Sequence, residues 1–184
     1  FTQATSSAVG RDIRSSGESL KAALIQGIVE SGCTVVDLGI VPTGVVYRST
    51  VDLNVDSAIA ITASHNPPEY NGFKIVHKGL PVAGEDLQRL KAIYESPDQG
   101  KANSPGTILS MSEYHHTVID AIVQDVGPLA RRVSVAVDSA NAVPGPFIME
   151  LCDKLGVDLV DLNCTWDQRS PAQHTQLTQQ GPRI

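Results

Sequence analysis

Residues 57–77 read SAIAITASHNPPEYNGFKIVH, and they decide the fold that the sequence predicts. The first part, Ser57 to Thr62, is small and aliphatic and predicts a buried β-strand. The last part, Phe73 to His77, predicts a second strand, and residues 63–72 predict a long polar loop between the two. Open α/β sheets place their ligand loops directly after buried strands. We therefore expect this loop to carry the functional site.

Strands and helices alternate on the N-terminal side of this stretch. A strand that ends at Ala8 to Gly10 is followed by a polar loop and by an amphipathic helix that Gly32 closes. Thr34 to Leu38 predict a short strand, and Val45 to about Leu53 predict a second helix after a proline-containing turn. This alternation is typical of a sheet with helices packed against it.

The C-terminal side continues with two more helices. Glu85 to about Glu95 keep helical periodicity and predict a helix with one buried face. Residues 96–106 are rich in Pro, Gly, Ser and Asn and predict an exposed connection. Met111 to Val126 predict a further helix, which Gly127-Pro128 ends.

A second unit begins near Arg131, where we place a domain boundary. Val133 to Val137 predict a strand, Pro146 to Leu155 a helix, and Leu159 to Leu162 another strand. The pattern is the start of a β-α-β arrangement like the first one.

The predicted fold class is therefore α/β. Residues 1–130 are expected to form a mixed, mostly parallel sheet sandwiched by helices, and residues 131–184 the start of a second, similar α/β domain.

Composition and charge restrict the class of partner. Of 184 residues, 41% are hydrophobic and 18% are charged, as in ordinary globular proteins. The net charge of −6 leaves no large basic surface for nucleic acid or an anionic membrane. No apolar run approaches the roughly 18 residues of a membrane span, so we expect a cytoplasmic protein that binds neither nucleic acid nor membrane. The three cysteines form no CxxC pair and are expected to be reduced thiols.

The polar loop contains a serine that could do chemistry. A hydroxyl at Ser64 can act as a nucleophile or a phosphoryl carrier if cationic groups offset the charge of the phosphate, and His65 and Lys74 are candidates for that task. The alternative is that Ser64 and His65 are ordinary turn residues, as most Ser-His pairs are. Residue types alone leave both interpretations open.

The ordered string TASHNPPEYNGFK, at residues 62–74, resembles the phosphoserine loop of the α-D-phosphohexomutases, and it is most similar to the phosphomannomutase/phosphoglucomutase branch. The segment at residues 9–17 is similar to that family's G-R-D-x-R-x-S-G motif, and residues 39–43 to its G-x-V-P-T turn. Residues 135–141 resemble the opening strand of its second domain, although Ala142 replaces a glycine. Beyond Leu162 the resemblance weakens, and Trp166 to Pro171 resemble a further motif of the family only faintly.

The resemblance implies a mechanism. Ser64 would be phosphorylated and would exchange its phosphoryl group with a hexose 1-phosphate or hexose 6-phosphate through a hexose 1,6-bisphosphate. Mg²⁺ would bind through the phosphate on Ser64, and Lys74 and Arg14 would line the phosphoserine pocket as positive charges. His65 would hydrogen-bond the phosphate or the loop. The alternative for Arg14 is a solvated side chain paired with Asp12.

Several motifs of the family are absent from the sequence: the metal-binding D-G-D-x-D-R run, the N-terminal Y/F-D-I-R-G strand, the E-x-S-G-H sugar loop and the R-x-S-G-T-E-P phosphate clamp. We therefore expect an incomplete part of a phosphohexomutase, with little activity alone. The alternative is a non-catalytic sugar-phosphate binding fragment or an inactive relic. A flavodoxin-like cofactor domain would need a Gly-rich turn after its first strand, which residues 10–12 do not supply. The preferred hexose and the oligomeric state stay open.

Overall fold

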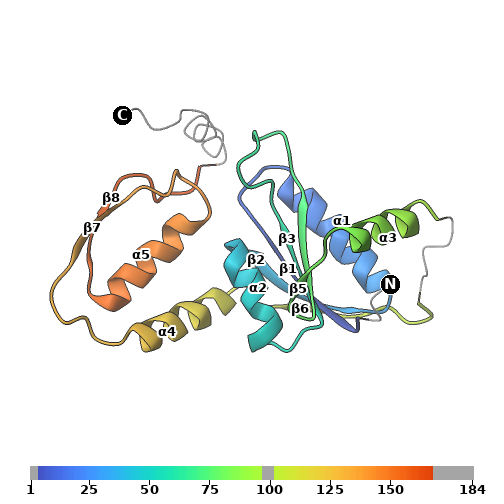
Figure 1. The fold of residues 1–184 in the computed structure, drawn as a ribbon, viewed down its shortest axis with the longest axis horizontal. Coiled ribbons are helices and arrows are strands. Elements are labelled where there is room, and N and C mark those ends of the chain that lie inside the picture. The colour runs from blue at the N-terminus through green and yellow to red at the C-terminus, as the bar shows by residue number, and fades with distance from the viewer. Residues whose placement is uncertain (1–3, 97–101, 168–184) are drawn as a thin grey trace.

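A computed structural model describes residues 4–96 and 102–167, which form two sheets with helices packed beside them (Figure 1). The larger sheet has six strands in the order β5-β4-β3-β1-β2-β6. Their bounds are β1 Ser6–Arg11, β2 Thr34–Ile40, β3 Ser57–Ile61, β4 Phe73–His77, β5 Leu80–Pro81 and β6 Ile108–Ser110.

The larger sheet is mixed and mostly parallel. β1 pairs in parallel with β2 and β3 on its two sides, and β6 joins β2 in parallel. β4 and β5 run antiparallel to the strands before them, because the loops that connect them contain no crossover helix. This confirms the predicted sheet and places the loop after β3 at the carboxyl ends of the parallel strands.

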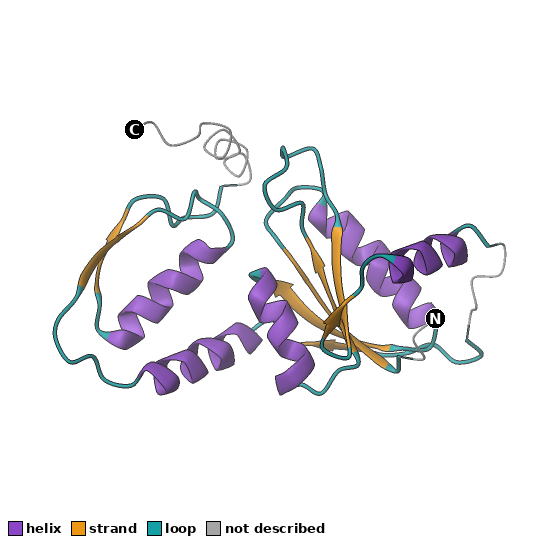
Figure 2. Ribbon diagram, viewed as in Figure 1, coloured by secondary structure: helices purple, strands orange, loops and turns teal. Residues whose placement is uncertain are grey.

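Helices cover both faces of this sheet (Figure 2). On one face, α1 (Gly17–Glu30) packs its buried Ile25 into an aliphatic cluster. On the other, α2 (Thr43–Asp52) and α4 (Tyr114–Val126) enclose a second cluster around Val46. Burying an aliphatic side chain of this size stabilises the fold by about 1.5–3 kcal/mol, so the two clusters fix the sheet between its helices.

The second unit is a β-α-β arrangement, as predicted. β7 (Ser134–Val137) and β8 (Asp158–Asp161) pair in parallel, and α5 (Pro144–Leu155) connects them. α4 packs against both α2 and α5, so it lies between the larger sheet and the second unit (Figure 1).

The helix α3 (Glu85–Tyr94) corrects one prediction. The sequence predicted a buried face, but no residue of α3 is buried, and Leu87 and Ile93 are 47% and 41% exposed. The reason is topological. α3 follows β5, the outermost strand of the sheet, and therefore lies at its margin, where little sheet surface is available to cover the helix.

The connection between α3 and α4 corrects a second prediction, because it contains the strand β6, which the sequence did not indicate. The following helix begins at Tyr114 and not at Met111. The Met111 N–H donates instead to the Asp37 carbonyl at 2.8 Å, which continues the pairing of β6 with β2. Residues 97–101 of the predicted connection lie outside the described residues, as do residues 168–171 of the faint motif.

None of the described helices is both long enough and apolar enough to cross a membrane. The three cysteines, Cys33, Cys152 and Cys164, are free thiols in the structure.

A hydrogen bond connects α4 to α2. The Tyr114 hydroxyl donates to Asp52 Oδ2 at 2.7 Å, and Arg48 Nε donates to the same oxygen at 2.9 Å. Burial of the Asp52 carboxyl acts to raise its pKa, but the hydrogen bonds from Tyr114 and Arg48 outweigh that effect and hold the pKa below its ordinary value. The ionised carboxylate is therefore the form that binds the two helices together.

Tyr114→Phe is expected to lower the free energy of unfolding by about 1 kcal/mol near pH 7, as measured by urea denaturation. A carboxyl whose pKa is lowered by folding stabilises the protein fully at pH values above its unfolded pKa of about 3.9. This stabilisation is lost as the pH falls through the pKa of the carboxyl in the folded state. The difference between Tyr114→Phe and wild type should therefore shrink below about pH 4. Tyr94→Phe, at a 79% exposed position, is the matched control. A difference that stayed constant between pH 7 and pH 3 would contradict this role for Asp52.

Candidate active site

The candidate site is the loop of residues 62–72, which rises from the larger sheet between β3 and β4 (Figure 2). Ile61 and Phe73 are the last paired residues of the two strands. The Thr62 N–H then donates to the Gly72 carbonyl at 2.9 Å and closes the base of the loop. The loop is therefore held at its base by the sheet, while the residues between are directed away from it.

Ser64 lies in the loop with an unusual backbone conformation. Its φ of 55° is in the left-handed region, which is strained for a residue other than glycine. The Ser64 N–H donates to Thr62 Oγ1 at 3.0 Å, which holds this conformation. Its side chain is exposed, and its Oγ lies 2.9 Å from His65 Nδ1. Ser64 and His65 are thus brought together with the hydroxyl accessible.

Arg14 lies beneath the loop and is only 2% exposed. Its NH2 group donates to the carbonyls of Ser64 and Asn66, at 3.0 and 2.8 Å. Its NH1 group donates to those of Pro67 and Tyr70, at 2.6 and 3.1 Å. Nε donates to Asp12 Oδ2 at 3.1 Å. A guanidinium has five donors, and all five are used, so Arg14 holds the loop in shape. The side chain is not solvated, which excludes that part of the alternative stated for it, although the ion pair with Asp12 is present.

Asp12 connects Arg14 to the start of the loop. Asp12 Oδ1 accepts from the Arg14 N–H at 2.9 Å, and Asp12 Oδ2 also accepts from Thr62 Oγ1 at 2.7 Å. Thr62 Oγ1 in turn accepts the Ser64 N–H described above. A continuous chain of hydrogen bonds therefore runs from Asp12 through Thr62 to Ser64, and such chains are stiffer than isolated bonds.

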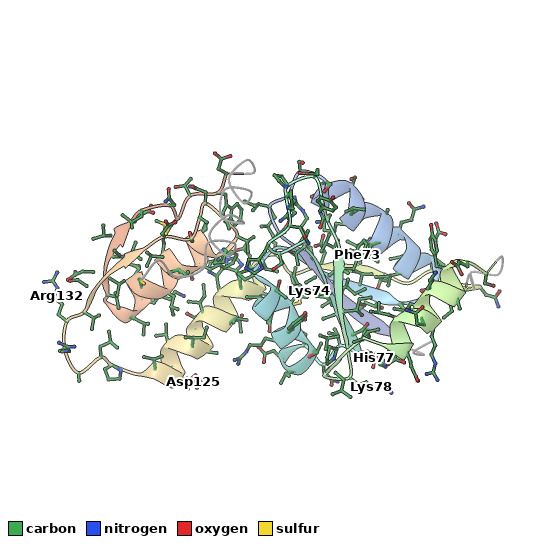
Figure 3. The ribbon with its side chains drawn as sticks, turned by 45° about the horizontal axis from the view of Figure 1, so that its top comes forward. Phe73, Lys74, His77, Lys78, Asp125 and Arg132 are labelled. Atoms are coloured by element: carbon green, nitrogen blue, oxygen red, sulfur yellow. The ribbon has the colours of Figure 1, made fainter. Side chains whose placement is uncertain are left out.

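Lys74 lies on β4, opposite Ala60 of β3, with an exposed side chain (Figure 3). Within residues 4–96 and 102–167, no hydrogen bond or ion pair engages its ammonium group. The structure thus brings Ser64, His65 and Arg14 together, whereas among the described residues no hydrogen bond or ion pair joins Lys74 to them.

Ser64 borders a cavity of about 150 Å³. Thr43, the first residue of α2, and Pro144, the first residue of α5, border the same cavity. Helix N-termini carry partial positive charge and favour anions such as phosphate. The cavity therefore combines an accessible hydroxyl with two helix ends suited to a negative ligand.

The described residues around Ser64 do not by themselves fit a Mg²⁺ site. Mg²⁺ requires several oxygen ligands in near-octahedral geometry. Asp12 supplies the carboxylate on the wall of this cavity, and both of its oxygens already accept hydrogen bonds from Arg14 or Thr62. A cation at Ser64 would need oxygens from elsewhere.

Sequence reasoning missed Asp12 and Thr62 as supports of the site. The signal was present, because Asp12 directly follows the end of β1 and Thr62 directly follows the end of β3, and the carboxyl ends of parallel strands meet at one edge of a sheet. Two polar residues at neighbouring strand ends could have been expected to meet.

Comparisons with known proteins agree with this architecture. A family model for the phosphoglucomutase/phosphomannomutase alpha/beta/alpha domain I matches residues 2–101. The phosphomannomutase/phosphoglucomutase of Pseudomonas aeruginosa is 39% identical over 168 residues, which cover 91% of this chain and 35% of that protein. The phosphoglucomutase of Neisseria gonorrhoeae is 35% identical over 170 residues, which cover 91% of this chain and 36% of that protein. The chain thus spans little more than a third of the length of these relatives.

A solved structure extends the similarity to three dimensions. The phosphoglucomutase/phosphomannomutase family protein of Burkholderia thailandensis superposes with a TM-score of 0.81 and 35% sequence identity, over 90% of this chain and 37% of that one. Sequence, family model and fold agree, and the chain belongs to the phosphoglucomutase/phosphomannomutase family.

Proposed function

We propose that Ser64 carries the phosphoryl group in a reaction that interconverts hexose 1-phosphates and hexose 6-phosphates. The observation that carries this proposal is the exposed Ser64 hydroxyl, fixed in a left-handed conformation beside a cavity bordered by two helix N-termini. Phosphoryl transfer depends on positioning and charge neutralisation more than on covalent assistance, and a rigid loop supplies the positioning.

In the proposed step, a hydroxyl oxygen of the hexose phosphate attacks the phosphorus of phosphorylated Ser64. The new phosphorus–oxygen bond to the sugar forms as the bond to Ser64 Oγ breaks, and the sugar becomes a hexose 1,6-bisphosphate. The proton of the attacking hydroxyl ends on Ser64 Oγ, and His65 Nδ1, 2.9 Å away, is suited to relay it. Return of the other phosphoryl group to Ser64 reverses these bond changes and completes the isomerisation.

Arg14 and Lys74 take different roles in this proposal. Because all five donors of Arg14 are used by the loop and by Asp12, Arg14 acts as a positioning residue that fixes Ser64. The exposed ammonium of Lys74 is the candidate for neutralising phosphate charge. Ser64 would then contact Mg²⁺ through its phosphate only, with the remaining ligands coming from outside the described residues.

We further propose a division into a first domain of residues 1–130 and a partial second domain of residues 131–184, both acting in the cytoplasm. On its own, the chain should turn over hexose phosphates only weakly, because Asp12, the carboxylate on the wall of the Ser64 cavity, already accepts hydrogen bonds at both oxygens.

Phosphorylation of Ser64 tests the proposal independently of turnover. The chain is incubated with glucose 1,6-bisphosphate, with and without Mg²⁺, and then measured by intact-protein mass spectrometry and peptide mapping. We expect one added phosphate on Ser64 in the wild type and none in Ser64→Ala.

Ser16→Ala is the matched control, since Ser16 Oγ contacts the same loop by accepting a hydrogen bond from Asn71 Nδ2 at 3.0 Å. It should keep the adduct. A folded wild-type chain without an adduct would favour a non-catalytic sugar-phosphate binding module instead, and an adduct that persists in Ser64→Ala would show that another residue accepts the phosphoryl group.

A further inference from the structure

A cluster of possible metal ligands lies at the start of α4, at a site separate from the Ser64 loop. Glu113, His115 and His116 each offer one ligand atom, and these atoms lie within 4.8 Å of one another. Glu113 directly precedes the helix, and the two histidines lie in its first turn. Within residues 4–96 and 102–167, this is the group of side chains whose composition and spacing suit a metal ion.

Each imidazole has a polar partner at its Nδ1 atom. His115 Nδ1 lies 2.9 Å from the Ser112 carbonyl oxygen, and a carbonyl only accepts hydrogen bonds, so this nitrogen carries the proton. His116 Nδ1 lies 2.7 Å from Glu150 Oε1 of α5. A neutral ring with its proton on Nδ1 presents a lone pair at Nε2. Metal-binding histidines are usually held in this way, by a carbonyl or a carboxylate at the second nitrogen.

Both ring nitrogens of His116 face carboxylates. Nε2 lies 3.0 Å from Glu113 Oε2, while Nδ1 already faces Glu150. A neutral imidazole has only one N–H, so it cannot donate to both carboxylates. Nε2 and Glu113 Oε2 are therefore close enough for one cation to contact both atoms, and a second proton on the ring is the competing arrangement. A second proton would make the ring an imidazolium, with the ring of His115 only 3.9 Å away between centroids.

We propose that Glu113, His115 and His116 bind a transition-metal dication, with Zn²⁺ as the best fit, and that Glu150 orients His116. Two imidazole nitrogens and one carboxylate are a ligand set that suits Zn²⁺, and water completes the coordination. Glu113 supplies a negative charge that offsets the partial positive charge of the helix N-terminus, while the charge of Glu150 is shared with Lys154 Nζ, which lies 3.2 Å from Glu150 Oε1. The hard cation Mg²⁺ prefers oxygen ligands and is a poor fit.

The side chains can close around an ion without disturbing the fold. Bonds of about 2.0–2.1 Å in a tetrahedral site place ligand atoms about 3.3 Å apart, so the cluster must contract somewhat. Glu113 is 80% exposed and His116 44% exposed at their side chains, and both can rotate. His115 and Glu150 also line a cavity of about 270 Å³ together with Phe147 and Trp166, which gives solvent and ions access. A bound metal would strengthen the contact between α4 and α5.

The position of Trp166 supplies a direct readout, because it is the only tryptophan of the chain and borders the same cavity as His115. The 184-residue chain is titrated with Co²⁺ or Ni²⁺, which quench tryptophan fluorescence at short range, while Zn²⁺ does not. We expect saturable quenching with one ion per chain. Zn²⁺ should reverse it by displacement, and excess Mg²⁺ should not.

Variants connect the signal to the named ligands. His115→Gln/His116→Gln should abolish saturable quenching, and Glu150→Gln should weaken binding about 10- to 100-fold. His65→Gln, which removes a histidine outside the cluster, should bind as the wild type does. Glu113→Gln changes an exposed side chain, and so tests the ligand set even if the double variant fails to fold.

Equilibrium dialysis with Zn²⁺ alone provides a second measurement that does not depend on Trp166. One Zn²⁺ bound to the wild type and none to Glu113→Gln or to the folded double variant would support the site. Equal binding by the wild type and these variants, or no stoichiometric binding by the wild type, would overturn it and leave the cluster as an ion pair between protonated His116 and its two carboxylates.

Discussion

The variant Arg14→Met is expected to have a free energy of unfolding about 3–5 kcal/mol lower than that of the wild type. Removing the guanidinium leaves the Asp12 carboxylate without its cation and leaves the four loop carbonyls without donors. Breaking one side of a buried ion pair is strongly destabilising because the remaining charge stays in place unpaired. Urea denaturation followed by circular dichroism measures the difference.

Two further variants make the Arg14 result interpretable. Arg89→Met removes an arginine that is 66% exposed at its side chain, and it should change stability by less than about 0.5 kcal/mol. Arg14→Lys should recover only part of the loss, because an ammonium has three donors and cannot reproduce the planar fork. If Arg14→Lys were as stable as the wild type, the role of the guanidinium geometry would be refuted.

The variant Gly145→Ala is expected to lower the free energy of unfolding by about 1–3 kcal/mol, and to disturb the start of α5. A Cβ at Gly145 would overlap the backbone carbonyl of Cys164, and a backbone atom cannot move aside as a flexible side chain can. The shift should reach Trp166, whose Nε1 donates to the Val143 carbonyl at 3.1 Å. Urea denaturation measures the loss, and the emission of Trp166 reports the local change.

Gly27→Ala is the matched control with the opposite expected sign. Gly27 lies inside α1, and a Cβ there would meet nothing within 4 Å. Alanine in a helix interior is more stable than glycine by about 0.5–1 kcal/mol, so this variant should be more stable than the wild type. Equal effects of the two substitutions would mean that Gly145 is not constrained by its contact with Cys164.

The sequence predicted the elements that have a strong local signal. The strands β2 and β3 contain short aliphatic runs, and the string at residues 62–74 identified the loop and its Ser64. The strand β6 has only three residues, and it pairs with β2, which is distant in the sequence. No local sequence pattern therefore indicated this strand. The apolar spacing of α3 was real, but periodicity does not say whether a sheet lies beneath the helix.

The surroundings of Arg14 could not be predicted for a different reason. Its partners in the loop are main-chain carbonyls. Because every residue has a main-chain carbonyl, the residue types of the loop do not indicate which positions accept hydrogen bonds from Arg14. The ion pair with Asp12 was considered because the two residues are close in the chain. The burial of Arg14 under a loop about fifty residues away required the fold itself.

This manner of holding the loop determines which substitutions the loop can accept. Arg14 recognises Ser64, Asn66, Pro67 and Tyr70 through their backbone oxygens, so those contacts do not depend on which side chains these positions carry. A substitution at Tyr70 is therefore expected to retain the contact with Arg14 and, with it, the position of Ser64. Substitution of these side chains therefore leaves the backbone contacts of Arg14 in place.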